Sequence, residues 1–248
     1  MIPEAFWRDL REDQQTLLMV SSSSWPINSR VGVYDSGILC ADCEQRLNMA
    51  DTYGAETLLT KFSSRFHEYR DQARGLVGYE AVDVDRDLLL QFLVSVLWRA
   101  SVSSHDFFRR VELGPWEDRA KEVTFGNVKA RSVGFDAVLR IWARAGRAHT
   151  PAPVLDPDHQ RWDGVRAYTL YLGRLMAVVK VDSLPFTQPF VAVSVAGTEP
   201  LRAVLSEFER AKEFNLMVKM ARQSEEIRRM TREQRAELMK RGASPSKR

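Results

Sequence analysis

The chain has 248 residues, a net charge of +3, 44% hydrophobic and 28% charged residues. This balance is typical of a globular protein and excludes a disordered or fibrous chain. Two cysteines in this length also exclude a disulfide framework. The longest apolar run, residues 88–97, is roughly half of the about 20 residues that span a bilayer, and the first ten residues lack a signal-peptide pattern. We therefore expect a cytoplasmic protein without a membrane segment.

The first third of the chain predicts short elements followed by one long helix. Two short β runs, residues 31–34 and 38–39, flank an Asp-x-Gly turn, which predicts a β-hairpin. A helix is expected to begin near Cys40 and to continue, with a break near Gly54, to about residue 69. Earlier segments are expected to form a short helix (3–10), a short strand (15–20) and a loop through the serines to residue 26.

The middle of the chain predicts a central helix. Residues 73–84 carry a short alternating strand pattern, and Asp85 or Asp87 can cap the helix that follows. From residue 88 to residue 100 this helix is apolar nearly all round, which predicts that it lies in the core. A further helix is expected at 117–123.

The second half predicts an antiparallel sheet. Four segments are rich in β-branched and aromatic residues, and Gly173-Arg174 between two of them indicates a tight hairpin. We expect three to five strands, packed against the central helix because neither element buries its apolar face alone. From Leu201 onward the pattern predicts helix again. The expected strands are residues 135–142, 165–172, 175–181 and 190–195.

Cys40 and Cys43 have the spacing of metal ligands at the beginning of a helix. Zinc prefers four sulfur or nitrogen ligands, and a hairpin followed by Cys-x-x-Cys is the second half of a treble-clef finger. No first pair precedes it, and the four histidines are scattered, although His67 could fold back as a third ligand. Two reduced cysteines that retain the fold of a lost finger are favoured over bound zinc, with a redox pair third because a βαβ context is absent.

Together these patterns predict an α+β fold in three regions. Residues 1–130 are expected to form a treble-clef-like hairpin and helix within a helical region. Residues 131–200 form an antiparallel sheet packed on it, and residues 201–248 a long basic helix with a disordered tail.

Five short motifs resemble a poorly characterised bacterial family of HNH-like treble-clef proteins. The likeness covers roughly residues 1–125 and implies the treble-clef fold. The chain lacks the family's N-terminal cysteine pair and the histidine before Ile2-Pro3, which in HNH nucleases acts as general base. The resemblance therefore implies the fold without the nuclease chemistry. The motifs are Ile2-Pro3-x-x-Phe6, Gly32-Val-Tyr-Asp35, Ile38-Leu-Cys-x-x-Cys-Glu44, Leu90-Gln-Phe-Leu-Val-Ser-Val-Leu-Trp-Arg-Ala-Ser101 and Leu113-Gly114.

Two other polar clusters predict structural roles. Glu80, Asp83, Asp85 and Asp87 lack the glycine and glutamate that a calcium loop requires, so helix capping is the better interpretation. The hydroxyls beside His105 are expected to form a polar helix end, because no nucleophile elbow is present.

The C-terminal region is basic. Residues 201–248 hold 13 Lys/Arg and 7 Asp/Glu, a balance of +6. Such an arm can bind phosphates or dock a partner, although interleaved glutamates also allow an exposed helix with internal ion pairs. The candidate contact residues are Arg228, Arg229, Arg232, Arg235, Lys240 and Arg241.

The sequence therefore predicts a non-catalytic binding protein that engages a protein partner or nucleic acid. One alternative is a metal-dependent HNH-type endonuclease whose coding sequence begins upstream of Met1. The other is a structural subunit stabilised by zinc.

Overall fold

The computed structural model describes residues 2–9, 17–21, 24–29, 32–143, 154–162, 164–197, 200–207, 211–213 and 215. Residues 1–206 form one compact unit and residues 207–248 a second, and the account below concerns the first. Its helices are α1 (Glu4–Asp9), α2 (Ala41–Ala55), α3 (Phe62–Arg65), α4 (Arg86–Ser101) and α5 (Glu117–Thr124). Its strands are β1 (Leu17–Ser21), β2 (Ser24–Ser29), β3 (His67–Asp71), β4 (Gly75–Ala81), β5 (Phe135–Ala143), β6 (Val154–Leu155), β7 (Asp158–Trp162), β8 (Val165–Leu172), β9 (Leu175–Val181) and β10 (Leu201–Glu207).

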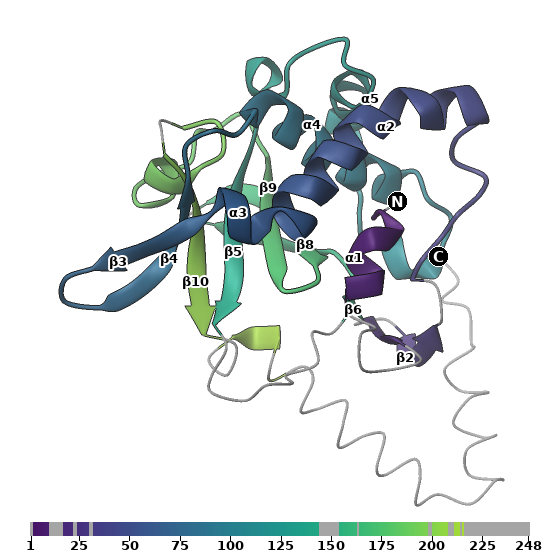
Figure 1. The fold of residues 1–248 in the computed structure, drawn as a ribbon. Coiled ribbons are helices and arrows are strands. Elements are labelled where there is room, and N and C mark those ends of the chain that lie inside the picture. The colour runs from purple at the N-terminus through teal and green to yellow at the C-terminus, as the bar shows by residue number, and fades with distance from the viewer. Residues whose placement is uncertain are drawn as a thin grey trace, which may run out of the picture. The chain divides into compact units, whose positions relative to one another are not determined.

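A mostly antiparallel sheet of seven strands is the centre of the fold (Figure 1), which confirms the predicted α+β class. Its strand order is β3-β4-β10-β5-β9-β8-β7. The hairpin β8–β9 turns at Gly173, whose φ of 71° is a conformation that glycine adopts without strain. A separate small sheet has the order β2-β1-β6.

Strand β10 lies inside the sheet, between β4 and β5. The helix predicted from Leu201 is therefore wrong over 201–207. Leu201 and Ala203 are buried on one face, and the pairing of β10 with β4 overrides the helical propensity of the local sequence. The sheet takes strands from all three predicted regions, so it crosses both predicted boundaries. The strand predicted at 190–195 is instead a 3₁₀ turn over Phe190–Val193.

Helix α4 lies between the sheet and α2 (Figure 1), as its all-round apolar pattern predicts. Its twelve buried residues include the fully buried Phe92. Asp85 is the N-cap and accepts a hydrogen bond of 3.0 Å from the amide of Leu88, which confirms the predicted capping. The break predicted near Gly54 is instead a π-helical segment, Glu56–Thr60, after the end of α2.

The predicted β-hairpin before Cys40 is wrong. Residues 32–40 contain a turn at residues 36–37 and no strand. The turn is closed by the Asp35 carboxylate, which accepts the amide of Gly37 at 3.1 Å. Trp25 and Pro26, expected in a loop, lie in β2.

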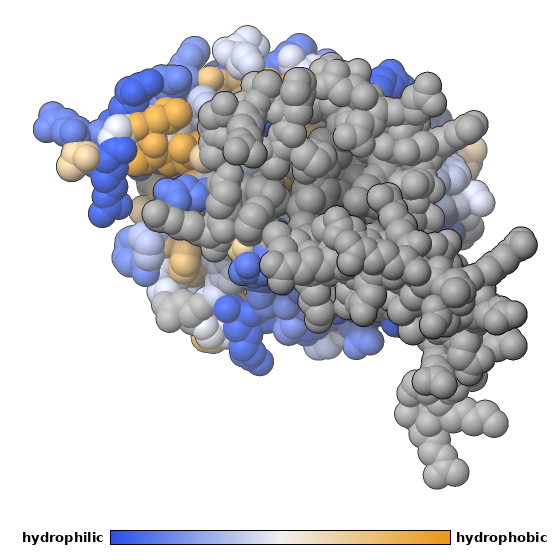
Figure 2. All heavy atoms as spheres, turned by 90° about the horizontal axis from the view of Figure 1, so that it is seen from below, coloured by the Kyte–Doolittle hydropathy of each residue, from blue (hydrophilic) through white to orange (hydrophobic). Residues whose placement is uncertain are grey.

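The hairpin β3–β4 extends the sheet at its β3 edge (Figure 1). Its far end, at the left of Figure 2, is covered mainly by hydrophilic residues. Charged side chains protect an edge strand from pairing with other chains, and Arg70 and Glu68 form such an exposed pair. None of the described helices is long and apolar enough to cross a membrane.

Candidate functional site

A cavity of about 320 Å³ lies where the N-terminal segment, the loop before α2, α2 and α4 meet. Its walls combine aliphatic side chains with four carboxylates and one guanidinium. Segments far apart in the sequence therefore converge here, including residues of four of the five short motifs quoted above. The lining residues are Ile2, Pro3, Glu4, Val33, Tyr34, Asp35, Ile38, Leu39, Glu44, Leu47, Asn48, Asp51 and Arg99.

Helix α2 presents a polar stripe to the cavity. Glu44, Asn48 and Asp51 follow the spacing i, i+4, i+7, which places them on one face of a helix. Leu47, only 1% exposed, lies beside this stripe and is part of the apolar wall. The cavity wall on α2 therefore combines three polar side chains with one aliphatic side chain.

Arg99 is the charged group at the base of the site. Its side chain is 5% exposed and forms a two-fold pair with Asp51, with distances of 2.8 Å from Nη1 to Oδ2 and 2.6 Å from Nη2 to Oδ1. Its Nε donates to the carbonyl oxygen of Ser95 at 3.2 Å. This bidentate geometry is the strong form of the arginine–carboxylate contact. Both terminal nitrogens of Arg99 are therefore hydrogen-bonded to Asp51.

Asp35 joins the loop before α2 to the end of α4. One carboxylate oxygen accepts the Ser103 hydroxyl at 2.8 Å and the Ser104 amide at 3.1 Å, and the other accepts the Gly37 amide. The Ser103 hydroxyl, followed by the Gly37 amide, holds the pKa of Asp35 below its usual value of 3.8.

We expect this loop to loosen in acid. Because the pKa of Asp35 is lower in the folded than in the unfolded chain, its contribution to stability is present above pH 3.8 and is lost as the pH falls through the folded pKa. Carbon-detected NMR titration of the Asp35 carboxyl should give a midpoint below 3.8, and Ser103→Ala should raise it. Ser36→Ala, an exposed neighbour in the same turn, is the control and should leave the midpoint unchanged; an equal midpoint in all three proteins would contradict the assignment.

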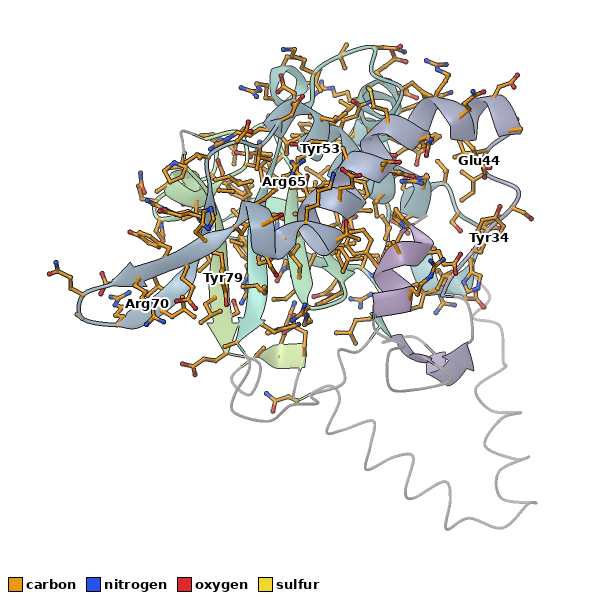
Figure 3. All side chains as sticks on the ribbon, in the orientation of Figure 1. Tyr34, Glu44, Tyr53, Arg65, Arg70 and Tyr79 are labelled. Atoms are coloured by element: carbon orange, nitrogen blue, oxygen red, sulfur yellow. The ribbon has the colours of Figure 1, made fainter. Side chains whose placement is uncertain are left out.

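The opening of the cavity carries Tyr34 and Glu44. Tyr34 is 66% exposed, and Figure 3 shows both residues on the side of the protein where α2 begins. Within the described part of the chain, no side chain pairs with the Glu44 carboxylate. Glu4 pairs with Arg8 at 3.4 Å, but both side chains are exposed, so water screens this contact.

Cys40 is the N-cap of α2. Its Sγ accepts the backbone amide of Cys43 at 3.4 Å, and both cysteines are free thiols. That amide, and then the Cys43 thiol, lower the pKa of Cys40, whereas the side-chain contact with Cys40 raises the pKa of Cys43. The predicted helix beginning at this pair is confirmed.

The structure does not bring further metal ligands to the cysteines. Among the described residues, no group of three or more His, Cys, Asp and Glu side chains could hold a metal ion. His67, considered as a third ligand, is exposed at the first position of β3. Zinc binding by Cys40 and Cys43 therefore stays a prediction. The six basic candidates, Arg228, Arg229, Arg232, Arg235, Lys240 and Arg241, lie outside the described residues.

The hydroxyls near His105 do not form a catalytic arrangement with it. Ser103 and Ser104 donate to Asp35, and Nδ1 of His105 accepts the amide of Phe107 at 3.1 Å. The structural interpretation of this segment is confirmed.

Two further ionisable side chains, a half-buried aspartate and a buried lysine, lie on neighbouring strands. Asp136 of β5 and Lys180 of β9 are register partners. Lys180 donates to the carbonyl oxygens of Asp182 and Leu184, and Asp136 accepts the amide of Ala196 at 2.8 Å. Burial raises the pKa of Asp136 and lowers that of Lys180. Each side chain fixes a loop to the sheet, which is a structural role.

Sequence reasoning missed most of the cavity. No sequence pattern pointed to Asp51 or Asn48, and Arg99 stood only within the longest of the five short motifs. One signal was present: an arginine inside an otherwise apolar helix requires a buried partner. The pattern could not identify Asp51 as that partner, because the contact joins two helices.

Comparison with known proteins gave no match to a protein-family model, to a curated protein or to a solved structure.

Proposed function

We propose that this protein is a non-catalytic binding protein that engages a protein partner by holding a basic side chain in the cavity beside α2. The observation that carries the proposal is the combination of an aliphatic wall with four carboxylates against one guanidinium. Lysine and arginine side chains have the matching chemistry, an apolar stem with a cationic end.

The charge of the cavity favours a cation. Asp51 neutralises Arg99 through the bidentate pair, so Asp35 and Glu44 leave an excess of negative charge around the opening. A concave surface of one sign attracts ligands of the other sign and repels phosphate groups. This favours a protein partner over nucleic acid at this site.

The hydrogen bonds of the cavity support binding rather than catalysis. Asp51 is held by Arg99, and Asp35 by two serines and an amide, so the oxygens of both carboxylates are engaged in fixed hydrogen bonds. Fixed carboxylates in a small pocket suit the recognition of a partner with little rearrangement.

The proposal is tested by selecting displayed random peptides on the full-length protein. We expect enrichment of peptides that contain lysine or arginine. Glu44→Lys should weaken a selected peptide about tenfold, equivalent to about 1.4 kcal/mol, because it places a like charge at the opening. Replacing the peptide's basic residue by norleucine should have a similar effect.

Glu68→Gln, on the exposed hairpin β3–β4, is the matched control and should leave affinity unchanged. Selection of peptides without basic residues, or equal affinity for Glu44→Lys and the original protein, would overturn the proposal. Duplex DNA serves as a competitor. Direct binding of the DNA to the protein with an affinity that Glu44→Lys does not change, and without loss of the bound peptide, would instead favour a nucleic-acid site elsewhere.

A further inference from the structure

Two thiols occupy the first turn of a 15-residue helix. Cys40 is exposed at the N-cap, and Cys43 is partly buried three residues later. The hydrogen bond of 3.4 Å from the Cys43 amide places the Cys40 sulfur directly over this turn. The more exposed sulfur, that of Cys40, therefore lies beside Cys43, which carries the second thiol.

This arrangement favours nucleophilic sulfur chemistry. The N-terminus of a helix carries about half a positive charge, which stabilises an anion at the N-cap. Reactive cysteines occur in this kind of environment, at helix N-termini and in Cys-x-x-Cys pairs. The lower exposure of Cys43 suits the thiol that reacts second.

We propose that Cys40 and Cys43 form a thiol–disulfide exchange site for low-molecular-weight disulfides. The Cys40 thiolate attacks one sulfur of the disulfide, forms a mixed disulfide and releases the first thiolate. The Cys43 thiol then loses its proton to solvent, attacks the Cys40 sulfur and releases the second thiolate. Two protein thiols are oxidised to one disulfide, and the small disulfide is reduced to two thiols.

The flanking charges select among such disulfides. Asp42 and Glu44, on either side of Cys43 in the chain, are both exposed. Their negative field disfavours the approach of an anionic disulfide and favours a cationic one. We expect cystamine to react about tenfold faster than glutathione disulfide at low ionic strength, and the difference to shrink when salt is added.

The test uses the full-length protein, freed of bound metal with a chelator. The protein is incubated with either disulfide, remaining thiols are trapped with N-ethylmaleimide, and intact masses are measured without reduction. We expect the original protein to lose both alkylation sites without gaining a disulfide adduct, and Cys43→Ser to stop at the mixed disulfide. Cys40→Ser should react about tenfold more slowly, while serine at the N-cap preserves the helix.

Three results would overturn the proposal: both thiols stay alkylatable, a mixed disulfide accumulates in the original protein, or Cys40→Ser reacts as fast as Cys43→Ser. Circular dichroism of each variant separates loss of reactivity from loss of the fold. Neither cysteine lines the cavity, so the inference does not rest on peptide binding, and either proposal can fail while the other holds.

Discussion

Replacing Asp51 by asparagine is expected to lower the free energy of unfolding by about 3 kcal/mol. The substitution removes the only charge that pairs with Arg99 among the described residues, while the guanidinium stays 5% exposed. A buried ion that loses its partner keeps its desolvation cost without the compensating attraction. Urea denaturation at neutral pH measures the effect.

Two further variants show whether the loss arises from the pair itself. Asp51→Leu combined with Arg99→Met removes both charges and should recover most of the stability, because no unpaired ion remains. Glu68→Gln breaks the exposed contact with Arg70 and should change stability by less than about 0.5 kcal/mol. If Asp51→Asn and Glu68→Gln behave alike, the ion pair at the base of the cavity does not have the importance we assign to it.

Gly54→Ala is expected to cost about 3 kcal/mol of unfolding free energy, although alanine is the better helix former. A Cβ atom at Gly54 would lie 2.3 Å from Cδ1 and Cγ of Phe92. Phe92 is fully buried and its ring stacks on Phe6 with a centroid distance of 6.0 Å, so it has little room to move. The close approach of α2 and α4, which also brings Asp51 to Arg99, depends on this glycine.

The Gly54 prediction is checked by chemical denaturation of single and double variants. Adding Phe92→Leu to Gly54→Ala reduces the overlap, so the double variant should be more stable than Gly54→Ala alone. Gly37→Ala is the control, because a Cβ there meets Asp35 at an ordinary 3.5 Å. A Gly54→Ala protein as stable as the original would show that the helices can separate at little cost.

The cavity connects these stability effects to binding. Asp51 and Arg99 form its base, Asp35 fixes one wall through Ser103, and Glu44 lies at the opening. Variants at the base should therefore change stability and binding together, whereas Glu44→Lys should change binding alone. This difference separates the recognition residue from the residues that hold the cavity in shape.

The predictions that succeeded rest on interactions within a short stretch of chain. Helix α4 follows from a continuous apolar run after a capping aspartate, and the hairpin β8–β9 from a glycine between two β-branched segments. The placement of Cys40 at the N-terminal end of α2 follows from the helical pattern of the residues after it.

The predictions that failed concern contacts between distant segments. The local sequence of residues 201–207 predicts a helix, but these residues form a strand because they pair between β4 and β5 in the sheet. Residues 32–40 read as a hairpin, but Asp35 finds its hydrogen-bond donors on Ser103 and Ser104, and these bonds set the loop. The backbone pairing and buried contacts between such distant segments contribute more to the free energy of folding than the local conformational propensity does.

The sequence by itself determined the α+β class, the central helix, its aspartate cap and the position of the two cysteines, because periodicity and capping act between near neighbours. Only the tertiary structure decided the seven-strand order and the acidic cavity. Its walls come from residues as far apart as Ile2 and Arg99, and nothing in a linear pattern specifies which side chains meet when two helices and a loop pack together.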